Sequence, residues 1–125
     1  MPRLTSLPLF LRLAIVAAVV AGLALASLEP RLAPPSAHNA DLWLHGLAYG
    51  GLTVILVALF ARPVVCALAA LVVSGTLEGL QALVPGRSAT WQDAMANAAG
   101  IALAFLVLIC LRRYLAARPS TQHPD

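Results

Sequence analysis

Four long apolar blocks dominate the hydrophobic pattern of the chain. They run over residues 10–28, 42–61, 64–84 and 94–111. Each block is close to the ~20 residues with which an α-helix crosses a bilayer. Continuous Ala, Leu and Val without alternation excludes barrel strands, and in lipid only helices or closed barrels satisfy their backbone. The pattern therefore predicts an all-α, polytopic membrane protein with four transmembrane helices in a small bundle.

Short polar segments mark the joints between these blocks. Residues 29–40 carry three prolines, Arg62-Pro63 is a two-residue break, and Pro85-Gly86-Arg87-Ser88 is a turn signal. Residues 112–125 form a short polar tail. We expect one transmembrane domain over residues 1–125, with no separate soluble domain.

The first block allows two interpretations. Arg3 precedes it and Ala24-Leu25-Ala26 closes it, as in a signal peptide with an A-x-A-like cleavage site. The block is longer than a usual signal-peptide core, however, which favours a retained helix, and the cleaved form stays open as the alternative. A stripe of small residues on this helix suits packing against another helix in a membrane: Ala14, Ala18, Gly22 and Ala26.

Composition and charge agree with a bilayer environment. The 125 residues are 61% hydrophobic and 10% charged, which leaves too little polar surface for a soluble globule. The basic residues are all arginine and form no run, so a nucleic-acid partner has no support. Six arginines fall on the side of the termini and two, Arg31 and Arg87, on the other. The positive-inside rule therefore predicts cytoplasmic termini and a multi-pass protein of the inner (plasma) membrane.

Polar residues gather where the second helix begins, the third ends and the fourth begins, which is the outer membrane face in this topology. A carboxylate at the centre of a membrane helix costs roughly 2.5 to 3.5 kcal/mol, so Glu78 should point into the bundle and find a partner. Residues three or four apart share a helix face, and three sets do so here: Asp41, His45 and Tyr49; Glu78 and Gln81; Asp93 and Asn97.

Pairs of small residues accompany the three polar faces. Such pairs let a neighbouring backbone approach closely, so we expect the second, third and fourth helices to pack tightly at the depth of the polar residues. The pairs are Gly46-x-x-x-Gly50, Gly75-x-x-x-Gly79 and Ala96-x-x-x-Gly100.

The loop before the fourth helix adds Arg87, Thr90 and Trp91 to the predicted site. Arginine offers fork-shaped donors for phosphate or carboxylate, and tryptophan suits the membrane interface. Asp93 has a simpler interpretation as the N-terminal cap of the fourth helix, a role that Thr90 or Ser88 also fits.

Metal and covalent chemistry have no clear signal in the sequence. Cys66 and Cys110 lie in apolar blocks without metal-ligand spacing, so we predict that both are packing residues. One histidine with scattered carboxylates falls short of a typical metal-ligand set, and no known catalytic motif is present. We therefore predict no metal and no cofactor.

The order and spacing of the polar motifs resemble the VanZ-like family of membrane proteins. The resemblance covers roughly residues 27–100. Two positions depart from it: Leu42 stands where members often carry Lys, and Ala104 where they often carry a second Gly. The motifs that carry the resemblance are Asp41-x-x-x-His45-x-x-x-Tyr49, Glu78-Gly-x-Gln81 and Pro85-Gly86-Arg87-x-x-Thr90-x-x-Asp93-x-x-x-Asn97-x-x-Gly100.

The resemblance implies a helical protein of the bacterial envelope, in a family named for a member associated with teicoplanin resistance, and it supplies no reaction. We predict a binding or modulating site at the outer face that affects glycopeptide susceptibility. Its partners would be membrane lipids and an anionic or lipid-linked envelope molecule. The alternatives are a membrane enzyme with Glu78 as base and His45 as acid, and a polar cluster that only stabilises the bundle. The oligomeric state stays open.

Overall fold

The computed structural model describes residues 4–29, 38–85 and 89–118, and these form helices joined by short connections. Four helices are long and apolar enough to cross a membrane, which confirms the predicted all-helical architecture. The predicted contributions of Arg87 and Ser88 lie outside the described residues. The elements are η1 (Leu4–Ser6), α1 (Leu9–Leu28), α2 (His38–Phe60), α3 (Pro63–Gln81) and α4 (Trp91–Ala117).

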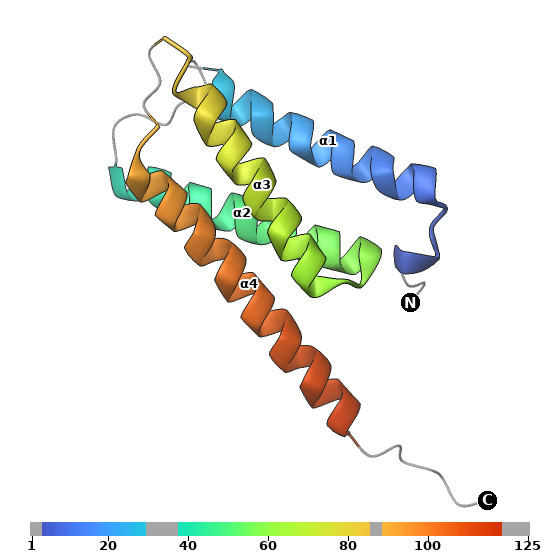
Figure 1. The fold of residues 1–125 in the computed structure, drawn as a ribbon. Coiled ribbons are helices and arrows are strands. Elements are labelled where there is room, and N and C mark those ends of the chain that lie inside the picture. The colour runs from blue at the N-terminus through green and yellow to red at the C-terminus, as the bar shows by residue number, and fades with distance from the viewer. Residues whose placement is uncertain (1–3, 30–37, 86–88, 119–125) are drawn as a thin grey trace, which may run out of the picture.

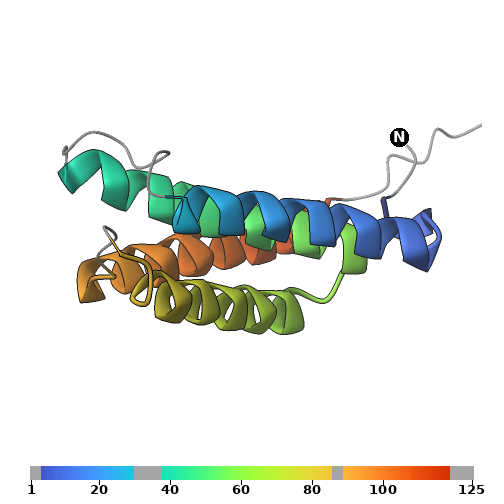
Figure 2. The same ribbon diagram turned by 90° about the horizontal axis from the view of Figure 1, so that it is seen from above.

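The four long helices form a bundle of two layers, with α1 and α2 in one layer and α3 and α4 in the other (Figure 2). The start of α1, the α2–α3 turn and the end of α4 lie toward one end, and the other ends of all four helices lie toward the opposite end (Figure 1). We call the first the arginine end and the second the polar end. Helix α2 contacts each of the other three long helices and is the most buried of them.

The core lies along α2, with Tyr49, Leu52 and Leu56 buried against Leu77 of α3 and Ile101 of α4. No residue of α1 is fully buried. Its half-buried face packs on the core mainly through larger side chains, whereas the stripe of small residues is exposed on the outside of the bundle. Larger apolar side chains remove more surface from lipid and fill the space between helices better. The packing residues are Val16, Val19, Val20, Leu23 and Ala24.

Helices α2 and α4 approach each other most closely at glycines. A Cβ atom on Gly50 would lie 3.0 Å from the carbonyl oxygen of Gly100, and one on Gly100 would overlap the carbonyl of Gly46. Two of the three predicted small-residue pairs therefore pack together. The third pair, Gly75 and Gly79, is exposed with open space beyond it, so that prediction is wrong.

The reason lies in the register of α3. Its buried face carries Ser74, Leu77, Glu78 and Gln81. Gly75 and Gly79 each follow a member of that face by one residue, which turns them about 100° away from the bundle. Of the two cysteines, Cys66 packs in the core as predicted, but Cys110 is exposed on α4.

Charged side chains at the arginine end hold the turn between α2 and α3. Ala61 ends α2 in the left-handed backbone region, with φ of 58°, and Pro63 opens α3 at its first turn. Arg12 donates from Nη1 to the carbonyl of Leu59 at 3.3 Å, and Arg112 donates from Nη1 to the carbonyl of Ala61 at 3.2 Å. Both arginines thus satisfy carbonyl groups at the negative end of α2.

The helix bounds differ from the predicted ones mainly at the polar end. Helix α2 begins at His38 and α4 at Trp91, each about one turn before its apolar block, while α3 ends at Gln81, short of the predicted residue 84. Helix α4 also continues to Ala117. Apolar blocks mark the depth of hydrocarbon, whereas helices begin and end where caps and turns satisfy the backbone.

Candidate functional site

Three helices each contribute one side chain to a buried polar network at the polar end. Asn97 of α4 donates from Nδ2 to Oε1 of Glu78 on α3 at 3.0 Å. The other end of the same amide, Oδ1, lies 3.1 Å from Nδ1 of His45 on α2. His45 Nδ1 also lies 3.4 Å from Glu78 Oε1. Asn97 is fully buried, so the three predicted polar faces converge on one amide.

The network determines the orientation of the histidine ring. The NH2 group of Asn97 faces Glu78 and its carbonyl oxygen faces His45, and an amide oxygen only accepts hydrogen bonds. His45 therefore carries a proton on Nδ1 and donates it to Asn97. Nε2 is then directed away from the network.

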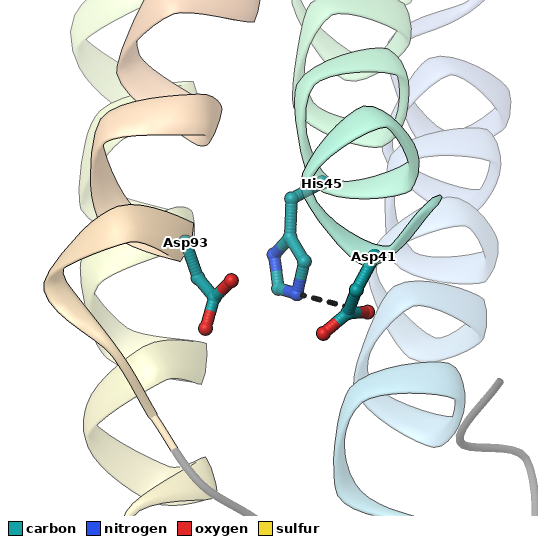
Figure 3. A group of neighbouring side chains, drawn as sticks. All are labelled: Asp41, His45 and Asp93. Atoms are coloured by element: carbon teal, nitrogen blue, oxygen red, sulfur yellow. Dashed lines mark ion pairs between the residues drawn. The ribbon is translucent and has the colours of Figure 1, made fainter. Parts of the chain in front are cut away.

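Two further carboxylates lie near the imidazole. Asp41 Oδ1 is 3.8 Å from His45 Nε2. One ligand atom each from Asp41, His45 and Asp93 all lie within 4.8 Å of one another. Figure 3 shows the imidazole between Asp93 of α4 on one side and Asp41 of α2 on the other. Carboxylates that the sequence scatters are thus brought together by the packing of α2 on α4.

The three carboxylates occupy unequal electrostatic positions. Asp41 and Asp93 lie in the first turns of α2 and α4, where the helix dipole favours an anion by about 0.3 to 1 kcal/mol. Glu78 lies in the last turn of α3, where the same dipole disfavours one. Its Oε2 atom is buried without a hydrogen-bond partner. Glu78 is therefore the least favourable charge in the cluster.

The N-terminal cap of α4 is Thr90, one of the residues that the sequence offered, and Asp93, which was predicted as the cap, is instead its partner three residues later. Thr90 caps α4 by accepting from the backbone N–H of Asp93 at 3.3 Å. In return, Asp93 Oδ2 accepts from the backbone N–H of Thr90 at 3.2 Å and from its hydroxyl group at 2.6 Å. This capping box fixes the start of α4 and holds Asp93 beside the imidazole.

A family model described as VanZ/LLP1 matches residues 6–112. The chain belongs to the VanZ/LLP1 family. It is thus a VanZ-like, multi-pass membrane protein, and the matched range holds all the polar motifs described above. No curated protein and no solved structure matches the chain.

The remaining residues of the predicted site in this VanZ/LLP1 chain divide into buried and exposed ones. Tyr49 is 2% exposed, one turn deeper than His45, and interacts with Ser27 of α1. Gln81 is buried in the last turn of α3. Below Tyr49, Thr53 is fully buried and donates to the Tyr49 carbonyl at 2.9 Å, a contact that the sequence did not indicate. Tyr49 and Thr53 form the floor of the cluster.

Two tryptophans lie at the polar end. Trp91 is 68% exposed, which agrees with its predicted place at the membrane interface. Trp43 is 74% exposed near the start of α2 and was missed, although an aromatic residue at the end of an apolar block is the usual signal of an interfacial anchor. Both are exposed at this end, as interfacial anchors would need to be.

An apolar groove of about 830 Å³ runs between α2 and α4. Leu42 and Trp43, which follow Asp41 in sequence, line it near the polar end, and Val107 lines it farther along α4. Gly51 also lies in its wall, and a Cβ atom there would meet open space, so the absent side chain widens the groove. Because its lining is apolar, the groove suits a hydrocarbon chain.

Proposed function

We propose that this VanZ-like protein binds an amphipathic, lipid-linked molecule of the bacterial envelope at the outer face of the plasma membrane, and that binding changes glycopeptide susceptibility. The polar part of that molecule meets the cluster of Asp41, His45 and Asp93. Its hydrocarbon chain follows the groove between α2 and α4. Arg87 stays the predicted contact for an anionic group.

The observation that carries this proposal is the position of Glu78. Its side chain is buried at the unfavourable end of α3, with Oε2 unpartnered. Polar contacts between membrane helices average about 0.6 kcal/mol, whereas a buried group left without a hydrogen-bond partner costs about 1 to 3 kcal/mol. A leucine would stabilise the bundle better. Because the cost of burying Glu78 exceeds the gain from a polar contact, a binding role is favoured over a purely stabilising one.

Native mass spectrometry of the protein taken from its own membrane tests the proposal. The parent and Gly79→Ala should retain the same lipid-linked molecule, and Glu78→Gln should lose it together with any effect on teicoplanin susceptibility. Gly79 is the matched control because it neighbours Glu78 on α3 but faces open space. A folded Glu78→Gln protein that keeps both the molecule and the phenotype would contradict the proposal.

A membrane enzyme is the second candidate, and the contact between His45 Nδ1 and Glu78 Oε1 at 3.4 Å supports it. A carboxylate and an imidazole at this separation suit acid–base chemistry on a lipid-linked substrate. Turnover separates the two functions. An enzyme would release a chemically altered lipid that Glu78→Gln does not make, whereas a binding protein returns its ligand unchanged.

A further inference from the structure

We propose that Asp41, His45 and Asp93 bind a divalent metal cation, with Zn²⁺ as the best-matched ion. These residues come from the first turns of α4 and the first two turns of α2, and their ligand atoms lie within 4.8 Å of one another (Figure 3). The inference rests on the proposed function in one respect, since it places the cation where the polar part of the envelope molecule binds.

The donor set is of the right chemical kind. Zn²⁺ takes imidazole nitrogen and carboxylate oxygen, and sites that act on a ligand use three protein groups and leave one position open. Bonds of about 2.0 to 2.2 Å place neighbouring ligand atoms roughly 3 to 4 Å apart. The widest pair in the cluster therefore needs to close by roughly 1 to 2 Å. The Asp41 side chain is 36% exposed, so it has room to make that movement.

The histidine is held as a metal ligand is usually held. Metal-binding histidines donate their second ring N–H to an acceptor, which fixes the ring and its tautomer. Here Nδ1 is bound by the fully buried Asn97, and Asn97 is itself fixed by Glu78. The Nε2 lone pair then points away from Asn97 and toward Asp41. The hydrogen bonds that join His45, Asn97 and Glu78 do not include either aspartate, so they support the site separately from the two carboxylates.

The aspartates are also in a suitable state. Asp41 Oδ1 lies 3.8 Å from His45 Nε2, which is too long for a hydrogen bond and leaves a gap between them. The capping box of Asp93 uses Oδ2, so the cap does not require Oδ1. Each aspartate therefore has an oxygen to offer without breaking a contact that holds its helix.

Charge gives the strongest reason for a cation. Among the described residues at this end, the carboxyl groups of Asp41, Glu78 and Asp93 lie around one imidazole, so acidic groups outnumber basic ones. Glu78 is nine-tenths buried and one of its oxygens has no partner. Burying unpaired charge is costly, and a divalent ion offsets it. With its open position, the ion also gives an acidic cluster the means to bind a phosphate or carboxylate group.

Calorimetric titration with Zn²⁺ tests the proposal on the full chain, purified in detergent and stripped with a chelator. The parent should bind one Zn²⁺ per chain, and Asp41→Asn should bind it at least about tenfold more weakly. Glu29→Gln is the matched control because it removes an exposed carboxylate at the same end of the bundle. No saturable uptake by the folded parent, or equal affinity in Asp41→Asn, overturns the metal site.

A second measurement uses a different variant, so the test does not depend on Asp41→Asn alone. Together with retention of the envelope molecule, it shows whether the metal site or the proposed function has failed. Co²⁺ added to the parent should give the visible absorption of a protein-bound ion, and His45→Gln should abolish it; an unchanged spectrum in a folded His45→Gln protein overturns the assignment. If the chelated parent takes up no Zn²⁺ but still retains its envelope molecule, the metal inference fails and the proposed function stands. If Zn²⁺ binds but no envelope molecule is retained in either state, the metal site stands and the proposed function fails.

Discussion

The two ends of the bundle handle charge in opposite ways. At the arginine end, Arg12 and Arg112 reach backbone carbonyls at the end of α2, and the Arg12 guanidinium also lies 5.5 Å from the centre of the Phe60 ring. At the polar end, charged and amide side chains turn inward and bond one another across three helices. The first arrangement completes a helix end. The second arrangement joins side chains of three helices, which the capping of a helix end does not require.

This difference shows how the same kind of residue serves two purposes in a membrane protein. Arg12 and Arg112 satisfy backbone carbonyls and thereby stabilise a turn, although Nε of Arg12 is itself buried without a partner. The buried Glu78 side chain instead joins the polar network, where its Oε2 atom has no hydrogen-bond partner. The comparison therefore predicts that substitutions at the arginine end change stability alone, and that those at the polar end separate stability from binding.

The largest expected effect is at Asn97. Asn97→Ala leaves Glu78 Oε1 and His45 Nδ1 without the amide that joins them, and each unsatisfied buried group costs about 1 to 3 kcal/mol. We expect a loss of about 3 kcal/mol in the free energy of unfolding, measured by thermal or denaturant unfolding in detergent. A loss below about 1 kcal/mol would mean that the network is not closed as described.

Gly100→Ala comes next. Its Cβ atom would overlap the carbonyl of Gly46 and force α2 and α4 apart, and overpacking of this kind costs about 1 to 3 kcal/mol. Gly79→Ala, which meets open space, should be neutral or stabilising by up to about 1 kcal/mol because alanine favours a helix. Equal melting temperatures for the two variants would contradict the close approach of α2 and α4.

Thr90→Ala should have a smaller effect, confined to the start of α4. The substitution removes the capping box with Asp93, and loss of an N-terminal cap costs about 1 kcal/mol. We also expect weaker Zn²⁺ binding, because Asp93 loses the partner that holds it beside His45. Thr76→Ala, an exposed threonine on α3, is the control. Hydrogen exchange at the first turn of α4 reports the local change.

The smallest effect is expected at the arginine end. Ala61 has a φ of 58°, a region that costs an ordinary residue about 1 kcal/mol or more. Ala61→Gly relieves this strain but adds disorder to the unfolded chain, so we expect a net gain of about 0.5 kcal/mol. Retention of any envelope molecule should not change. A clear loss of stability would show that the turn is held differently.

Much of this fold is readable from hydropathy, because apolar stretches of about 20 residues have few alternatives in a bilayer. Spacing also placed His45, Glu78 and Asn97 on inward faces, since a buried charge needs partners. Spacing could not distinguish the packed glycines, Gly50 and Gly100, from the exposed Gly75 and Gly79. A small residue matters only where another helix lies against it, and that depends on the three-dimensional packing.

The aspartates show the same limit at the site. Asp41 and Asp93 are far apart in sequence, and nothing local indicates that both reach one imidazole. Their meeting depends on how deeply α2 and α4 interlock at the glycines, together with a start of α4 that Thr90 determines. The sequence predicted no metal site because spacing alone leaves the two aspartates scattered, and that prediction has yet to be tested.

The most direct test of the central claim is the unfolding midpoint of Glu78→Gln in detergent, measured beside the retention of the envelope molecule. Glutamine keeps an oxygen to accept from Asn97 and removes the charge that is buried with an unpartnered atom. A binding site predicts a midpoint equal to or above that of the parent, with the molecule lost. A midpoint as low as that of Asn97→Ala, with the molecule retained, would instead show that Glu78 serves to hold the bundle together.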